Sequence, residues 1–231
     1  MLLEAATESE WVAQHLEALG HEVIVADPNF APRYATRSRR VKTDRRDART
    51  LAEACRVGAD RRAHRLSPLR RHLRTELAVR DALLRTRTRY VALLNTIVRR
   101  EGLRLPGGDP AATGAKVVAL PLSPTAQAEI APLVALLEPL NTELAAADER
   151  LALVTAGDPL GQRLMSVPTI GPVTAVGYVA TLDGVDRFAD GHQVAAYLGL
   201  TPSERSSGER QRRGRISEAG NPRVRWLLVE V

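Results

Sequence analysis

Two runs of apolar residues that repeat every seven positions constrain the fold of this chain more than any other feature. The first run consists of Leu77, Leu84, Val91 and Val98. The second run consists of Ile130, Leu137, Leu144 and Leu151, with a companion position held by Leu133, Leu140, Ala147 and Val154. Such a repeat places its members along one side of a helix. The sequence therefore predicts two long helices, joined by the Gly/Pro-rich linker 105–124, that form a helical hairpin or coiled coil within residues 66–160.

Two prolines interrupt the second of these helices. Pro132 and Pro139 lie inside it, and an interior proline costs about 3 kcal/mol. We therefore expect a kink there and a regular helix only from Leu140 onward. The two helices can pack within one subunit or join two subunits into a homo-oligomer, and the repeat is compatible with both.

Residues 1–65 have the pattern of a partial α/β domain. The sequence predicts a strand that ends at Glu4, a helix from Ser9 that Gly20 stops, a β-branched strand over 21–26 and a helix over 44–57. Strands and helices that alternate at this spacing favour a parallel unit with functional groups at the strand ends. We expect the apolar face of the first helix to consist of Trp11, Leu16 and Leu19.

The charge of the chain favours a polyanionic partner, most simply nucleic acid. The net charge is +6 and the isoelectric point is near 10.2. The excess is concentrated, because residues 33–74 contain 15 Lys and Arg against four Asp and Glu. Aromatic residues make up only 3% of the chain, which argues against stacking platforms for single strands. The candidate phosphate contacts in this patch are Arg39, Arg40, Lys42, Arg45, Arg46 and Arg49.

Two carboxylates stand three residues apart inside the same basic patch. Asp44 and Asp47 share one helix face, near a helix N-terminus that favours anions. They can pair with the neighbouring arginines, or they can hold Mg²⁺ against a phosphodiester. Glu4, at a strand end, is a possible third ligand.

The segment 161–231 offers a second set of candidates and reads as a mainly α domain. Pro168, Ile170 and Gly171 form a tight turn between two helices, which can present backbone N–H groups to a phosphate or serve only as a packing corner. Ser206 and Ser207 precede Gly208 among arginines, where a hydroxyl could act as a nucleophile or belong to a solvated turn. The arginines nearest these serines on the C-terminal side are Arg210, Arg212 and Arg213.

Other features concern the cellular compartment. The single cysteine, Cys55, excludes an internal disulfide. The N-terminus has no signal-peptide pattern, and no apolar run approaches the roughly 20 residues of a membrane span. We therefore expect a cytoplasmic protein without a membrane partner.

Several of these signals occur together in an order that resembles one protein family. The string KTDRRDARTLAEA, preceded by Glu4 and GHEVIVADP, is similar to the first domain of the DEDD-type bacterial insertion-sequence transposases, relatives of the Piv site-specific invertase. The strings SVPTIGPVTA and RFADGHQVAAYLGLTPSERSSGERQRRGRISEAGNPRVRWLLVE resemble the C-terminal domain of the same family.

The resemblance implies a fold and a chemistry. It implies an incomplete α/β N-terminal domain of the RNase H or RuvC-like type, a helical hairpin insertion that supports multimers, and a mainly α C-terminal domain with a helix-hairpin-helix-like turn. Glu4, Asp44 and Asp47 match the family's second, third and fourth acidic positions, which bind Mg²⁺ in a two-metal site. Ser207 best matches the serine that attacks the DNA phosphate, and Ser206 is the competing choice. The family also works with a structured guide RNA.

The chain departs from the family pattern at both ends. The family's first aspartate lies on an opening strand, whereas this chain has three residues before Glu4, and it stops at Val231 within the last helix. We therefore expect a truncated copy that is weakly active or inactive alone. The alternative function is a non-catalytic basic protein that binds nucleic acid.

Overall fold

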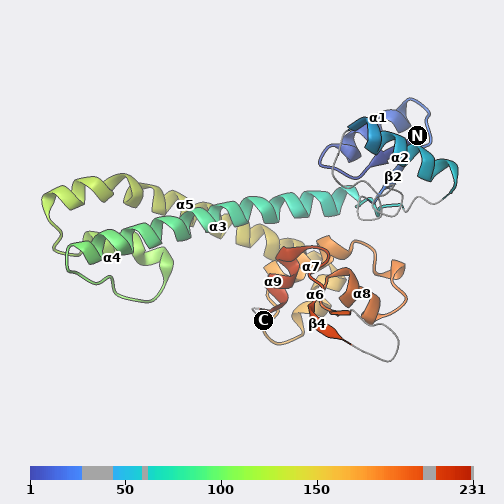
Figure 1. Cartoon of the computed structure of the whole chain (residues 1–231). Coiled ribbons are helices and arrows are strands. Elements are labelled where there is room, and N and C mark those ends of the chain that lie inside the picture. Colours follow the sequence, from blue (N-terminus) through green and yellow to red (C-terminus); the bar gives the residue numbers. More distant parts are fainter. Residues whose placement is uncertain (28–43, 59–61, 205–211, 230–231) are drawn as a thin grey trace. The chain divides into compact units, whose positions relative to one another are not determined.

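The structure is a computed structural model that describes residues 1–27, 44–58, 62–204 and 212–229. The chain divides into two compact units, Met1–Leu66 and Ser67–Val231, and most of the described residues are helical (Figure 1).

The first unit contains the predicted order of strand, helix, strand and helix. Strand β1 (Leu2–Glu4) and strand β2 (Ile24–Ala26) are parallel, with Glu4 opposite Ala26. Helix α1 (Ser9–Ala18) connects them, and helix α2 (Asp44–Arg56) packs against β1. The unit is therefore a small piece of α/β structure, as the strand and helix pattern predicts.

The buried side of α1 differs from the prediction. Trp11 is 70% exposed and Leu19 is 62% exposed, whereas Ala13 is fully buried. The side of α1 that carries Ala13 also carries Glu10 and Glu17, and both carboxylates bind the guanidinium of Arg65 (Glu10 Oε2 to Nε, 2.9 Å; Glu17 Oε2 to Nη2, 3.0 Å). These ion pairs raise the pKa of Arg65 and lower the pKa of Glu17. A polar anchor, rather than the largest apolar side chains, determines which side of α1 faces inward.

The second unit is built on the predicted helical hairpin. Helix α3 (Pro68–Arg100) and helix α5 (Pro124–Gly157) run antiparallel and side by side (Figure 1). Each begins with a serine cap followed by proline: the hydroxyl oxygen of Ser67 accepts from the Arg70 N–H, and that of Ser123 accepts from the Ala126 N–H. The linker contains a short element that the sequence did not predict, a 3-10 turn η2 (Pro110–Ala112) that leads into helix α4 (Thr113–Val118).

The seven-residue repeat is the packing seam of this hairpin. All four members of the second run are at most 3% exposed: Ile130, Leu137, Leu144 and Leu151. In the first run Leu77 and Val98 are buried, and Leu84 and Val91 are partly buried. One core cluster lies near the linker, where Val98 meets Val117 and Ile130, and a second lies at the opposite end, where Leu77 meets Leu151. The repeat is therefore satisfied within a single chain.

Helix α5 includes both prolines and is helical well before Leu140, so the expected late start is wrong. Pro132 and Pro139 are seven residues apart and both are exposed. The carbonyls that lose their usual N–H partner belong to Ala128 and Ala135, which are exposed as well, so water can hydrogen-bond to them. The prolines are tolerated because they lie on the side of the helix away from the seam.

The rest of the second unit surrounds one buried helix, α7 (Pro172–Leu182). Eight of its eleven residues are buried, and it packs against α3, α5, helix α6 (Pro159–Met165) and helix α9 (Pro222–Val229). Between α7 and α9 come a 3-10 turn η3 (Val185–Arg187), helix α8 (Gly191–Tyr197), and an antiparallel strand pair, β3 (Pro202–Glu204) and β4 (Arg213–Ile216). The strand pair was not predicted, and it interrupts the otherwise α-helical C-terminal segment.

Polar contacts attach these helices to α3. The Ser67 hydroxyl and N–H both donate to the Asp183 carboxylate at the end of α7, over 2.8 and 3.0 Å. Arg223 of α9 pairs with the buried Asp81 of α3. Burial, together with the nearby positive charge of Arg80, lowers the pKa of Arg223.

Helix α5 also bears on the membrane question. It is long and apolar enough to cross a membrane by length and composition alone, although it contains no uninterrupted apolar run of about 20 residues. Its buried row packs against α3, and its outer side carries Glu129, Glu138 and Glu143. This pattern is typical of the core helix of a hairpin.

We predict that the seam dominates the stability of the second unit. Leu151→Ala, at a position 1% exposed, should lower the free energy of unfolding by about 3 kcal/mol, because it removes buried methyl groups and leaves a cavity. Leu153→Ala, two residues away at a position 68% exposed, should change it by less than about 0.5 kcal/mol. Urea unfolding followed by circular dichroism measures both. Equal losses for the two variants would contradict the buried seam.

Candidate functional site

The carboxyl ends of β1 and β2 bring acidic residues to one edge of the first unit. Glu4 ends β1 and is exposed, and the Ala5 N–H donates to the Ala26 carbonyl over 2.9 Å, so the two strand ends lie together. Asp27 directly follows β2 at the same edge. Sequence reasoning missed Asp27, although an acid directly after a strand was the signal that identified Glu4.

Helix α2 begins at this unit's other predicted acids. Asp44 is its first residue and Asp47 follows three positions later, but the side chains of both lie outside the described residues. Asp47 occupies the helical position two turns before Ala54, which is 2% exposed. Among the side chains that the structure describes, no three acidic, histidine or cysteine residues are grouped as metal ligands. The three-carboxylate site stays a prediction.

The predicted turn between two helices joins α6 to α7. The Ile170 N–H donates to the Val167 carbonyl over 3.2 Å, which closes a β-turn with Pro168 and Thr169 at its centre. Pro168 and Thr169 are exposed, and Gly171 caps α7. Thr169 has a φ of 76°, so the turn matches type II geometry, in which the third position favours glycine. A β-branched residue therefore holds a strained conformation at this turn.

Strands β3 and β4 flank the two candidate serines. Ser206 and Ser207, with Arg210, fall between these strands and lie outside the described residues. The Ser203 hydroxyl donates to the Arg215 carbonyl over 3.0 Å and joins the two strands near this connection. Arg213, the first residue of β4, and Arg212 directly before it are exposed.

A contact between two glycine-containing loops closes the base of this strand pair. Gly199 follows α8 with a φ of 72°, and Gly220 precedes α9 with a φ of 80°. A Cβ atom at Gly199 would overlap the Ala219 backbone, and one at Gly220 would overlap the Tyr197 carbonyl oxygen. Arg225 Nη1 donates to the carbonyls of residues on both loops: Leu198 (3.2 Å), Ala219 (2.6 Å) and Gly220 (3.2 Å). We call Gly199, Gly220 and Arg225 the glycine clasp.

The clasp fixes both chain segments that lead to the serines. The Ser217 N–H donates to the Thr201 carbonyl over 2.8 Å, directly beyond the two strands. Sequence reasoning missed the clasp. The available signal was a pair of glycines on either side of the strand pair, one shortly after α8 and one shortly before α9.

The predicted basic residues of the first unit are described only in part. Arg45 and Arg49 are exposed on α2. Arg39, Arg40 and Lys42 lie outside the described residues, as does the side chain of Arg46.

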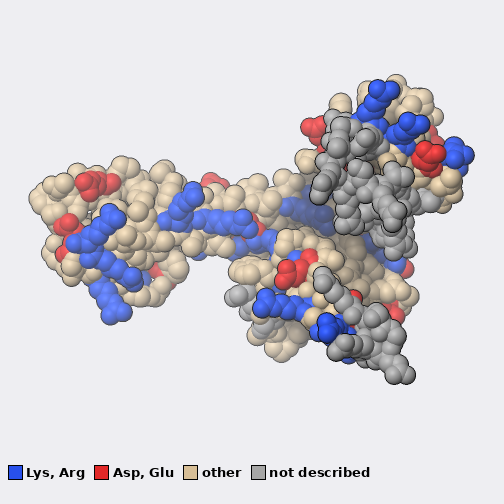
Figure 2. All heavy atoms as spheres, viewed as in Figure 1, with Lys and Arg blue, Asp and Glu red and all other residues tan. Residues whose placement is uncertain are grey.

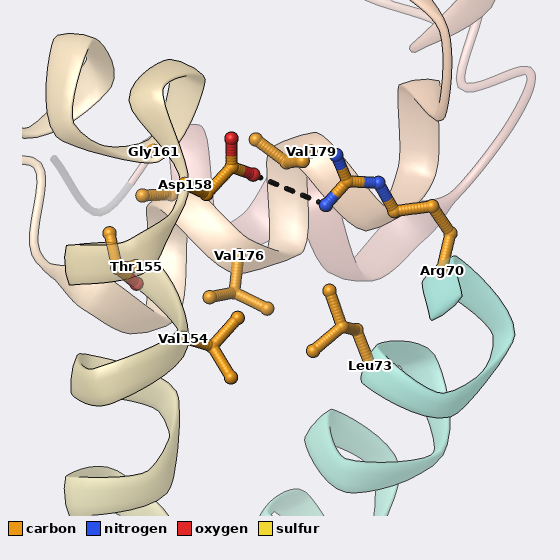
Figure 3. A pocket seen from close by; sticks show the side chains of 9 residues that line it. Arg70, Leu73, Val154, Thr155, Asp158, Gly161, Val176 and Val179 are labelled. Atoms are coloured by element: carbon orange, nitrogen blue, oxygen red, sulfur yellow. Dashed lines mark hydrogen bonds and ion pairs between the residues drawn. The ribbon is translucent and has the colours of Figure 1, made fainter.

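A small depression where α3, α5, α6 and α7 meet is a packing joint rather than a ligand site (Figure 3). Arg70 of α3 and Asp158, between α5 and α6, form an ion pair across it at 3.2 Å. Leu73, Val154 and Val176 lie on one side of this ion pair and line a space that is too small for a water molecule. The guanidinium of Arg70 and the carboxylate of Asp158 therefore pair with each other across the joint.

Comparisons with known proteins match both ends of the chain. A family model described as "Transposase IS116/IS110/IS902 family" matches residues 161–231, and a DEDD-type model described as "Transposase" matches residues 2–100. A probable family 20 transposase of Pseudomonas aeruginosa is 32% identical over 98% of this chain and 68% of its own length. The transposase for insertion sequence element IS1111A of Coxiella burnetii is 32% identical over 81% of this chain and 53% of its own length. The chain thus spans between about half and two thirds of these relatives.

We predict that the glycine clasp is intolerant of side chains. Gly220→Ala should destabilise the second unit by more than about 2 kcal/mol, because the new Cβ meets the Tyr197 carbonyl and the residue keeps a positive φ. Gly184→Ala is the matched control, since its φ is −91° and no atom lies within 4 Å of its Cβ position. Thermal unfolding of the two variants gives the comparison. A Gly220→Ala protein as stable as the control would show that the two loops are not in contact.

Proposed function

Because the chain belongs to the IS116/IS110/IS902 family of transposases, we propose that it acts in Mg²⁺-dependent DNA strand exchange of an insertion sequence, with a serine as nucleophile. One observation carries this proposal. The family match over residues 2–100 contains Glu4, Asp44 and Asp47, and the match over 161–231 contains Ser206 and Ser207, so both parts of the chemistry occur in their family context.

Glu4, Asp44 and Asp47 would hold the metal. Their oxygen atoms are the hard ligands that Mg²⁺ prefers, and Mg²⁺ completes its shell with water and phosphate oxygens. The packing of α2 against β1 supports the proposal, since it joins the helix of both aspartates to the strand of Glu4. When bound, Mg²⁺ would orient the scissile phosphate and neutralise charge that develops on its oxygens.

Ser207 would attack the DNA phosphate, with Ser206 as the competing choice. The serine Oγ forms a bond to phosphorus, the bond to a deoxyribose oxygen breaks, and the serine proton goes to that oxygen or to water. In the reverse step, a hydroxyl of another strand takes the phosphate back and restores the serine. Arg212 and Arg213 would stabilise the extra negative charge at phosphorus, together with Arg210. The glycine clasp supports this role, because it anchors both segments that lead to the serine.

DNA would be held by backbone contacts in both units. We assign these contacts to the basic patch of residues 33–74 and to the turn of Pro168, Ile170 and Gly171. The exposed turn supports its assignment, since a helix start next to an exposed turn can donate N–H groups to a phosphate. A structured guide RNA is the second polyanion that we propose for these surfaces. A DNA substrate in the cell also supports a cytoplasmic location.

We further propose that copies of the chain assemble through the hairpin. The buried residues of the seven-residue repeat already pack against α3 within one chain, so a second copy would meet the outer side of α5. Leu136 and Leu153 are exposed there, at 47% and 68%.

We predict that the two aspartates are needed for metal binding but not for DNA binding. Asp44→Asn combined with Asp47→Asn should weaken Mn²⁺ or Mg²⁺ binding at least tenfold in calorimetry and abolish strand exchange, because two anionic ligands are lost. DNA affinity should stay equal or increase, since repulsion with phosphate falls. A matched variant, Glu53→Gln, removes one exposed carboxylate from the same helix and should leave metal binding unchanged. Unchanged metal binding in the double variant would favour the non-catalytic alternative.

We predict a covalent protein–DNA adduct that depends on one serine. Ser207→Ala should remove the adduct from a denaturing gel, whereas Ser206→Ala should retain it, because only one hydroxyl bonds to phosphorus. Ser203→Ala is the control, since the Ser203 hydroxyl already donates to the Arg215 carbonyl within the strand pair. An adduct that survives in Ser207→Ala but not in Ser206→Ala would transfer the role to Ser206. An adduct that survives in both the Ser206→Ala and the Ser207→Ala variant would contradict the serine mechanism.

A further inference from the structure

Helix α3 is strongly basic, and seven of its arginines fall into two sets. The helix contains nine arginines and two acidic residues. Four of the arginines contact other parts of the second unit. Their partners are Asp158 for Arg70, the Ala180 carbonyl for Arg74, Asp148 for Arg80 and the Asn141 side chain for Arg87. These side chains attach α3 to α5 and α7.

The second set lies on the side of α3 opposite the Arg80 and Arg87 contacts to α5. Arg85, Arg89 and Arg100 are four and eleven residues apart, which is close to one and three helical turns, so they share one side of α3. All three are exposed, and in the described part of the chain none has a recorded hydrogen bond or ion pair. They extend over about 22 Å of helix at a rise of about 1.5 Å per residue. We call these three residues the α3 ridge.

The surroundings of the ridge leave it accessible. The small exposed residues on this side of α3 are Ala78 and Ala82 before Arg85, and Ala92 and Thr96 between Arg89 and Arg100. The Thr96 hydroxyl donates to the Ala92 carbonyl over 3.0 Å, so it is occupied within the helix. A partner can therefore approach the guanidinium groups over these small residues, with Leu93, 45% exposed, at the margin of the ridge.

The two helices of the hairpin carry opposite charge. Helix α5 contains five acidic residues and one arginine. Four of its acidic residues are exposed: Glu129, Glu138, Glu143 and Glu149. Figure 2 shows Lys and Arg side chains gathered along the hairpin on the face drawn. A polyanion would be attracted to α3 and repelled by α5.

We propose that the α3 ridge binds the phosphodiester backbone of a nucleic-acid duplex and orients the hairpin with α3 toward the duplex. The inference deepens the proposed function, because it adds a nucleic-acid contact surface in the hairpin. Guanidinium groups bind phosphate oxygens in a bidentate manner, and such contacts need no sequence readout. A protein partner would instead have to bring carboxylates to guanidinium groups spread along the helix, and the experiment below separates that outcome.

The test is a salt titration of duplex binding by the full chain. Arg85→Gln combined with Arg89→Gln should lower the affinity for a duplex of about 20 base pairs by about 30-fold at 0.15 M salt. It should also make the log–log salt slope shallower by about 1.8, at roughly 0.9 per lost phosphate contact. The matched control is Arg104→Gln combined with Arg150→Gln, which removes the same charge from exposed positions off the ridge and should change affinity less than threefold.

Two duplexes of the same sequence, one of DNA and one of RNA, identify which backbone the ridge contacts. A loss on either duplex that exceeds the control supports the proposal. Wild-type affinity on both, or a loss equal to that of the control, overturns it. Analytical sedimentation measures whether the ridge variant still self-associates. A ridge variant that loses self-association but keeps its duplex affinity would show that the ridge binds glutamates of a second copy. That result also overturns the proposal. Duplex binding needs neither the carboxylates nor the serine, so this result and that of the strand-exchange experiments are independent.

Discussion

The apolar seam between α3 and α5 is the interaction on which the second unit depends. At the linker end of the seam, α4 packs against the hairpin. At the opposite end, α7 packs against Leu77 and Leu151. Once α7 is held there, the segments on both sides of it are placed as well. The turn of Pro168 lies before it, and α9 packs on its surface. Two groups proposed to act on DNA, the turn and the serine segment, are thus placed by residues with no role in the chemistry.

Polar contacts add to the apolar seam in holding the helices of the second unit together. Burying the Asp81–Arg223 pair removes two charges from water, so this pair is a costly way to hold α9 on α3. It does specify where α9 lies, because an apolar contact would tolerate sliding along the helix. The glycine clasp works at shorter range, through backbone groups, on the two segments beside the serines. The positions of the helices and loops in the second unit are therefore determined first by apolar burial in the seam, then by the Asp81–Arg223 ion pair, and last by the close backbone contacts of the glycine clasp.

The sequence predicted the features that depend on local pattern. The seven-residue repeat predicted the hairpin, and alternating strand and helix signals predicted the first unit. Features that depend on distant residues were missed or misassigned. Nothing near α1 indicates that Arg65 selects its inner side, so Trp11 was wrongly assigned to the face of the helix that packs inward. Strand β4 is rich in arginine and exposed along its whole length, so it has no alternation to detect. The glycine clasp brings together two loops about twenty residues apart, a proximity that only the folded chain reveals.

The outer prolines of α5 have a consequence for whatever covers that helix. Pro132 and Pro139 lack an N–H, so the carbonyls of Ala128 and Ala135 cannot receive the usual helical hydrogen bond. In water these acceptors are solvated at little cost. A wholly apolar partner would strip that water, at about 1–3 kcal/mol for each acceptor left unsatisfied. The surface of α5 therefore favours partners that bring hydroxyl or amide donors to two points seven residues apart. It disfavours partners whose contact surface is entirely apolar.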